Sequence, residues 1–459
     1  MGILMKIKLL FLMLMLFRIT PIFATSDYQV DIDRTKQKIH VAACFKGSMP
    51  HYLINGDWQQ HPDILIAPKT KPYVYLNYWG SIEILKQPPD KCVRYQVTIA
   101  SESRYRRQFV NRNFSIISTH KWLWRPKTID SSDPVIITFN VSDKDHVFTP
   151  WPPVLHGKNQ FSLTSTPPEW DSRIIVGTFT QQVLPLDKKT DFEIAYLNTN
   201  PSQRQKLNQV LKVNGNNIVK TFQGFPQQPT KIIVMNVNRG RGPVPFGQIL
   251  RGGSAVIWLY VNATKKSVDF INDWTITHEM THLMMPYIAS SDNWISEGLA
   301  SYFQYVSRAQ NGQITAVEAW RKLASMYESG KESAGDQTIR ETSDRMFTYW
   351  GGAAFFMLSD IEIRLQSHGK LNLQRVFARF KACCLSYESS WRPYRFFNQL
   401  DKQLDSPVFI PMYRKFSKTK GFPNLHPYFK KLGINFDTTW KKIKAEDLTR
   451  LANNIMILD

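Results

Sequence analysis

The sequence of 459 residues has only four cysteines, and its 37 Asp plus Glu are outnumbered by 58 Lys plus Arg. So few cysteines exclude a small disulfide scaffold, in which cross-links replace a hydrophobic core. Internal repeats and low-complexity segments are absent, which excludes a solenoid. No segment beyond the N-terminus approaches the roughly 18 consecutive apolar residues of a membrane span. The mature chain is therefore expected to have no transmembrane segment.

What the sequence does contain is hydrophobic and aromatic residues in quantity. They make up 43% and 13% of the chain, enough to bury cores and unlike a disordered basic tail. At roughly 100 to 200 residues per domain, the length predicts two to four domains. The formal net charge of +21 favours weak attraction to anionic surfaces. Composition by itself selects no chemistry.

The first residues have the layout of a secretory signal peptide. Lys6 and Lys8 precede an apolar run from Leu9 to Phe17, and small residues follow. The run is too short to span a bilayer, although Arg18 leaves an uncleaved signal anchor as the alternative. We expect residues 1–24 to be removed and the protein to be exported to the periplasm or outside the cell. Removal takes three positive charges from the +21 and leaves +18.

An exported chain can form disulfides, so the positions of the cysteines matter. Cys44 and Cys92 lie in one β-rich region, far enough apart to close a loop, and are predicted to pair. Cys383 and Cys384 are adjacent in an expected helix, where a bond between them would strain the backbone. For that pair we expect two free, buried thiols, although the sequence leaves the question open.

Short apolar runs separated by turn residues dominate the sequence up to about residue 185. Pro, Gly, Asn and Asp punctuate them, and no helical period of useful length interrupts them. Residues 25–185 are therefore predicted to form a β-rich N-terminal domain. The clearest strand candidates are 73–76, 93–99, 135–141 and 174–180.

Beyond residue 186 the pattern becomes mixed and then helical. A polar helix is expected at 202–222, followed by apolar strands at 231–237 and 254–261 that a Gly- and Arg-rich connection joins. Helices dominate after residue 273. Their expected ranges are 273–284, 292–308, 316–328, 350–367 and 373–384. We predict an α+β multidomain protein with a mixed domain at 186–385 and a helical C-terminal region at 386–459.

The segment Thr277-His278-Glu279-Met280-Thr281-His282 carries the clearest chemical signal. His278 and His282 are four residues apart, so on a helix both imidazoles leave the same face and can bind one tetrahedral Zn²⁺. Glu279 lies beside that position, where its carboxylate can take a proton from a zinc-bound water without being a ligand. The alternative is a chance match on an amphipathic helix.

A catalytic zinc site needs a third protein ligand, and the next expected helix supplies Glu297. It lies on the face opposite the apolar stripe that includes Ile295 and Leu299. The separation of 14 residues between His282 and Glu297 leaves room for a turn at Pro286 and an antiparallel return. The usual alternative for a helical glutamate is a solvated surface charge. Together the two segments indicate one Zn²⁺ per chain, with water in the fourth position.

The run HEMTH followed by WISEGLASYF resembles the gluzincin zinc metallopeptidases. The ligand spacing is similar to that of the glycyl aminopeptidase family, which is related to aminopeptidase N. The resemblance implies a thermolysin-like catalytic domain within 186–385, behind a β-rich N-terminal domain and followed by a helical tail. It also implies hydrolysis of peptide bonds, with peptides or proteins as substrates.

By the same resemblance, Tyr349 in the stretch Tyr349-Trp350-Gly351-Gly352 donates a hydrogen bond to the oxyanion of the tetrahedral intermediate. A phenol there would act selectively on the transition state, because neutral substrate lacks that charge. The family usually has a Lys where this chain has Gly351. Tyr287, Tyr302 and Tyr305 are rivals that the sequence pattern does not exclude.

The segment before the zinc helix departs from the aminopeptidases. The larger relatives in the aminopeptidase N family carry a glutamate here that holds the substrate's amino group. This chain has no acidic residue from 238 to 257, and the same segment contains Arg239, Arg241 and Arg251. An ammonium group would gain nothing there, so aminopeptidase, endopeptidase and a preference for acidic substrates all stay open. Arg251, Gly252, Gly253 and Ser254 are candidate substrate-binding residues that could accept a peptide as an added strand. A turn into the next strand is the alternative.

The remaining basic clusters are interpreted as solvated faces. Arg104, Arg106 and Arg107 interleave with Tyr105, a mixture that can bind nucleic acid, but we expect no specific nucleic-acid partner. Two other functions remain for the zinc constellation. One is a zinc hydrolase of a non-peptide substrate, and the other is a non-catalytic peptide-binding protein.

Overall fold

The structure is a computed structural model that describes residues 26–57, 59–60, 62–64, 73–99, 108–110, 112–130, 134–163, 165–227, 229–434 and 443–458. The predicted signal peptide and the cluster at 104–107 lie outside these residues. Among the helices of the described part, none combines the length and apolarity needed to cross a bilayer.

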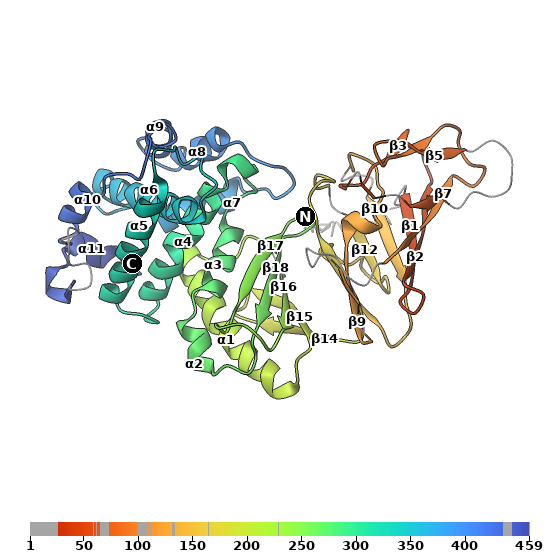
Figure 1. Cartoon of the computed structure of the whole chain (residues 1–459), viewed down its shortest axis with the longest axis horizontal. Coiled ribbons are helices and arrows are strands. Elements are labelled where there is room, and N and C mark those ends of the chain that lie inside the picture. Colours follow the sequence, from red (N-terminus) through yellow and green to blue (C-terminus); the bar gives the residue numbers. More distant parts are fainter. Residues whose placement is uncertain are drawn as a thin grey trace, which may run out of the picture.

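The N-terminal domain is built from strands, as the sequence predicts (Figure 1). A six-stranded sheet has the order β12-β10-β1-β2-β7-β4, a four-stranded sheet the order β11-β13-β9-β8, and a small sheet the order β3-β6-β5. The strands are β1 (Ser26–Asp33), β2 (Lys38–Phe45), β3 (Tyr52–Leu53), β4 (Asp63–Ile64), β5 (Val74–Leu76), β6 (Ile82–Ile84), β7 (Cys92–Thr98), β8 (Gln108–Val110), β9 (Phe114–Ser118), β10 (Val135–Asn140), β11 (His146–Phe148), β12 (Gln160–Leu163) and β13 (Arg173–Gly177).

A five-stranded sheet begins the second domain. Its order is β14 (Thr180–Pro185), β15 (Asp191–Leu197), β16 (Thr230–Asn236), β18 (Val256–Val261) and β17 (Phe246–Leu250). The three inner strands are parallel, and both edge strands are antiparallel to their neighbours. The inner strands are buried on both sides, which explains their continuous apolar sequences. The sheet starts at Thr180, earlier than the expected boundary at 186, because β14 pairs with β15.

The four-stranded sheet joins the two domains because it is apolar on both faces. Ile117 and Ile174 point into the core of the N-terminal domain. Their neighbours Ile116 and Ile175 point the other way and pack in one cluster with Trp258 of β18. Alternate side chains of these strands therefore pack into two different hydrophobic clusters, one on each face of the sheet. This packing holds the two domains together.

Apart from α1, which lies between β15 and β16, the helices follow the five-stranded sheet in the chain (Figure 1). They are α1 (Pro201–Phe222), α2 (Ser267–Asn272), α3 (Thr275–Thr281), α4 (Trp294–Gln310), α5 (Ala316–Ala334), α6 (Arg345–Gln366), α7 (Leu373–Cys383), α8 (Pro393–Asp401), α9 (Phe409–Phe416), α10 (His426–Lys431) and α11 (Arg450–Ile455). One hydrophobic cluster extends from Leu184 to Met456. The helical C-terminal region therefore shares its core with the domain that precedes it.

Two glycines let α4 and α6 cross closely. A Cβ on Gly298 would lie 2.3 Å from the backbone carbon of Gly352, and a Cβ on Gly352 would lie 2.2 Å from the carbonyl oxygen of Trp294. Only glycine permits this approach. Glu297 precedes one of these glycines and Tyr349 lies a turn before the other. The crossing therefore brings two predicted site residues from separate helices to one region.

The structure agrees with one cysteine prediction and corrects the other. Cys44 and Cys92 face each other in the register of β2 and β7 and form the expected disulfide. The expectation of two free, buried thiols at Cys383 and Cys384 is wrong, because these residues are bonded to each other and Cys383 is exposed. The physical reason is that α7 ends at Cys383, and Cys384 leaves the helical conformation with φ −140°.

Candidate metal centre and active site

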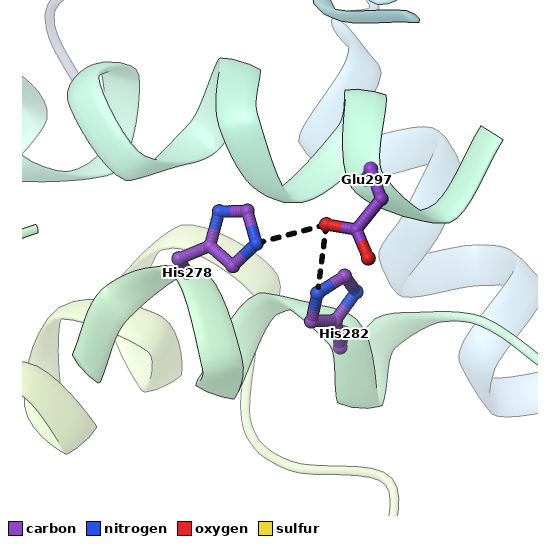
Figure 2. Close-up of side chains that lie close together, drawn as sticks. All are labelled: His278, His282 and Glu297. Atoms are coloured by element: carbon purple, nitrogen blue, oxygen red, sulfur yellow. Dashed lines mark hydrogen bonds and ion pairs between the residues drawn. The ribbon is translucent and has the colours of Figure 1, made fainter. Parts of the chain in front are cut away.

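The three predicted ligands meet at one point. His278 lies in α3, His282 begins the 3₁₀ turn that follows it (His282–Met284), and Glu297 lies in the first turn of α4. Glu297 Oε2 is 3.2 Å from His278 Nε2 and 3.6 Å from His282 Nε2 (Figure 2). One donor atom from each residue lies within 4.8 Å of the other two. Helix α3 and the 3₁₀ turn that follows it thus present the two imidazoles to the carboxylate of α4.

Two further side chains orient the imidazoles. His278 Nδ1 donates to Gln304 Oε1 at 2.8 Å, and His282 Nδ1 lies 2.9 Å from Ser296 Oγ. Since Nδ1 is occupied in both rings, the Nε2 lone pairs are directed at the position between the three residues. Both partners come from α4, so the helix that supplies the carboxylate also aligns the histidines. Sequence reasoning missed these residues, although Gln304 lies two helical turns after Glu297, on the same face of α4.

The charges of this group suit a cation. Burial opposes ionisation of Glu297, but the neighbouring His282 and His278 hold the pKa of its carboxyl well below its usual range. Burial also opposes a charged His278, yet Glu297 raises the pKa of that imidazole. Two imidazole nitrogens and one carboxylate oxygen are the donor set of a catalytic zinc site with one open position. The residues present therefore fit Zn²⁺.

Glu279 lies next to this group on the same cavity. The cavity has a volume of about 410 Å³, and Glu279, His278, His282 and Glu297 all line it. Burial raises the pKa of Glu279, whose side chain is shielded by the strand above it. A Cβ on Gly247 of β17 would lie 2.5 Å from Glu279 Cγ. A glycine in this strand therefore makes room for the carboxylate.

Strand β17 forms one wall of the cavity. The lining includes Phe246, Gly247, Gln248 and Ile249. Among the described residues, β17 is the last strand of its sheet and has β18 as its one neighbour, so its other edge is available to an extended peptide. The sequence suggested a substrate-binding strand in this region but did not locate β17 within the Gly- and Arg-rich connection. The single glycine inside a strand was the available signal.

The four residues predicted to bind substrate lie in two different places. Arg251 lines the cavity. Gly252, Gly253 and Ser254 instead pack against the N-terminal domain, where Gly252 N donates to Asp171 O at 3.3 Å and Ser254 N to Pro150 O at 3.0 Å. The N-terminal domain uses the backbone donors of Gly252 and Ser254, so these two are not free for a substrate strand, whereas β17 lines the cavity.

Tyr349 lies on the cavity wall, and its ring is parallel to that of His278 with centroids 5.8 Å apart. Burial, followed by the charges of Glu297 and Glu279, raises the pKa of Tyr349 and keeps the phenol able to donate. Tyr302 donates to Asp360 at 3.0 Å in the core, and Tyr305 is buried against Trp350. Of the three rivals, Tyr287 alone shares the cavity with Tyr349.

Solved structures share this arrangement of domains. An aminopeptidase N family protein from Idiomarina loihiensis matches with a TM-score of 0.63 at 14% identity, over 89% of this chain and 78% of that one. An M1 zinc metallopeptidase from Deinococcus radiodurans matches with a TM-score of 0.55 at 12% identity, over 88% of this chain and 94% of that one. This chain has the fold of the M1 zinc metallopeptidases.

A further solved structure, a two-domain M1 zinc metallopeptidase variant bound to L-arginine, matches with a TM-score of 0.55 at 14% identity, over 88% of this chain and 95% of that one. No protein-family model matches the sequence, and a search of curated proteins finds no match. The M1 fold agrees with the predicted β-rich domain, mixed sheet and helical C-terminal region.

Proposed function

We propose that this protein is a zinc-dependent metallopeptidase that hydrolyses peptide bonds. The observation that carries the proposal is the convergence of five side chains on one cavity: His278, His282 and Glu297 as metal ligands, with Glu279 and Tyr349 beside them. One Zn²⁺ per chain, held by the three ligands, would polarise the scissile carbonyl and make water a better nucleophile at neutral pH.

Glu279 is the general base of the proposed reaction. Its carboxylate lies on the cavity beside the ligands but outside the group of three that can share one metal ion. From there it takes a proton from the attacking water and then transfers it to the nitrogen of the leaving amine. The raised pKa of Glu279, which follows from burial, favours this role because a stronger base accepts the proton more readily.

Tyr349 stabilises the oxyanion. Its phenol is held protonated by burial and by two neighbouring carboxylates, so it donates a hydrogen bond to the negative oxygen that develops as water adds to the carbonyl. The neutral substrate offers a weaker acceptor, and the bond therefore lowers the barrier selectively.

The substrate is an extended peptide along the open edge of β17. The antiparallel edge of the sheet supplies backbone groups along one wall of the cavity, and main-chain hydrogen bonds there would position the scissile bond over Glu279. These contacts suit both trimming from a terminus and internal cleavage. We further propose, from the signal-like N-terminus, that the enzyme acts after export, in the periplasm or outside the cell.

The test compares purified wild-type protein with Glu279→Gln on a peptide mixture, together with zinc content. We expect about one zinc per chain in both proteins and cleavage in the wild type alone, because glutamine keeps the shape but cannot take the proton. Zinc without Glu279-dependent cleavage would refute the peptidase and leave the metal site standing. Absence of zinc would refute both. The termini of the products separate trimming from internal cleavage.

A further inference from the structure

Arg251 is a buried cation on the wall of the active-site cavity. It follows the last residue of β17, and only 8% of it is exposed. Its Nη2 donates to the carbonyl oxygen of His282 at 2.8 Å, and its guanidinium lies 5.3 Å from the ring of Tyr387. These contacts fix the guanidinium at the end of the zinc helix, facing the same space as the predicted metal ligands.

The charge of Arg251 is not balanced within the described residues. No carboxylate of that part of the chain forms an ion pair with it, and Nη1 is buried without a hydrogen-bond partner. Burial lowers the pKa of Arg251, and the groups that oppose this effect are the phenols of Tyr387 and Tyr287. A buried cation without an anion is costly, and an unsatisfied buried donor adds to the cost. Arg364, by contrast, pairs with Asp360 at 3.1 Å. Arg308 donates to two backbone carbonyls and, like Arg251, has buried nitrogens without a partner, but it does not line the cavity.

Among the described residues that line the cavity, no acidic group is left to serve as the missing partner. The carboxylates in that lining are Glu279 and Glu297, which the proposed function uses as base and ligand. The segment from 238 to 257, which includes β17, contains no Asp or Glu at all. A substrate ammonium would thus meet a cation on this wall, whereas a substrate carboxylate would meet an unused N–H donor and a compensating charge.

We propose that Arg251 binds a carboxylate of the substrate, so that the enzyme prefers peptides with an anionic group near the scissile bond. The inference rests on the proposed function and names its substrate class. Nη1 is covered in the structure, so a carboxylate oxygen accepts from it after the side chains around it shift, while Nη2 stays on His282. The carboxylate can come from an acidic side chain or from the peptide's C-terminus, and both sources offer the same chemistry.

The experiment measures kcat/KM on matched peptide pairs. One pair differs by Glu against Gln beside the scissile bond, and the other by a free C-terminus against its amide. We expect the wild type to favour the acidic member of one pair by about tenfold or more, the scale of one charge-assisted hydrogen bond. The pair that shows the preference identifies the source of the carboxylate. Equal rates for both members of both pairs would overturn the proposal.

Variants then attribute the preference to one side chain. Arg251→Met removes the charge and should reduce the ratio to near one, and Arg251→Lys should retain part of it because the ammonium cannot reproduce the fork of the guanidinium. Arg241→Met is the matched control, since Arg241 is exposed in the same acid-free segment and lies outside the cavity. A preference that survives Arg251→Met in protein with normal zinc content would overturn the assignment.

A binding measurement separates this inference from the proposed function. Two proteins are titrated with the same peptide pairs: the Glu279→Gln variant, which should not hydrolyse peptides, and the double variant that also carries Arg251→Met. Tighter binding of the acidic member that depends on Arg251 supports the inference even if no peptide is hydrolysed. Cleavage that depends on Glu279 but ignores the carboxylate supports the proposed function and overturns the inference.

Discussion

Gly247 and Glu279 lie in direct contact: a Cβ added to Gly247 would be 2.5 Å from Glu279 Cγ and 2.7 Å from its Oε1. One residue belongs to an edge strand and the other to the zinc helix, so the contact ties the wall that would hold substrate to the proposed general base. Gly247→Ala should push Glu279 out of position and lower kcat about 100-fold, since a misplacement of about 1 Å has effects of that size. The zinc ligands should be unaffected.

The matched control for Gly247→Ala is Gly242→Ala. A Cβ on Gly242 would have its nearest neighbour, Asp273 Oδ2, at an ordinary contact distance of 3.7 Å. The two variants are compared by kcat on one peptide and by zinc content. Near wild-type turnover in Gly247→Ala would show that Glu279 tolerates the crowding or is not the base.

Tyr349→Phe should lower kcat about 100- to 1,000-fold with little change in KM, because the lost hydrogen bond forms mainly in the transition state. Tyr302→Phe is the control, since its hydroxyl is bonded to Asp360 in the core, and it should affect thermal stability more than turnover. Tyr287→Phe tests the remaining rival on the cavity. If that variant loses the larger share of kcat, the oxyanion contact belongs to Tyr287.

Gln304→Leu should weaken zinc binding about 10- to 100-fold, because the hydrogen bond to His278 Nδ1 holds the imidazole in the tautomer and orientation that bind metal. Competition with a chromogenic chelator measures the dissociation constant directly. Gln310→Leu lies on the same helix with its amide bonded to the backbone of Ile455, and it should leave zinc affinity unchanged. Equal affinities for all three proteins would contradict the orienting role of Gln304.

Removal of zinc should destabilise the protein. The three predicted ligands come from α3, the 3₁₀ turn after it, and α4. The ion would therefore link these segments in the folded state only. At a free zinc concentration of about 1,000 times Kd, the free energy of unfolding should rise by about 4 kcal/mol. Thermal unfolding with and without a chelator measures this change. His278→Ala should lose the response to zinc, and a chelator-sensitive Tm in that variant would argue for a different site.

The two disulfides should contribute unequally to stability. The bond between Cys44 and Cys92 spans 48 residues and restricts the unfolded chain, which predicts a loss of about 4 kcal/mol in a Cys44→Ser, Cys92→Ser double variant. The bond between Cys383 and Cys384 joins neighbours, so the corresponding double variant should unfold at nearly the wild-type urea concentration. Similar losses from both double variants would refute the chain-entropy explanation.

The parts of the fold that local sequence controls agree with expectation. The helix at 202–222 is observed as α1, where Asn200 and Gln203 form a capping box and Pro201 takes the first helical position. The inner strands β16 and β18 coincide with the expected apolar runs. The expected single helix at 273–284 is divided into α3 and a 3₁₀ turn that starts at His282. That break depends on the surrounding packing, and the hydrophobic pattern does not encode it.

The sequence alone predicted the three candidate metal ligands that the structure brings together, because their spacing is local. The spacing of His278 and His282 in one continuous turn of chain, and of Glu297 in the next helix, indicates which face each side chain takes. The tertiary structure decided the rest of the site. It placed β17 over Glu279, packed Gly252 to Ser254 against the other domain, and buried Arg251 without a carboxylate partner among the described residues. These outcomes depend on contacts between segments distant in sequence, which no local pattern records.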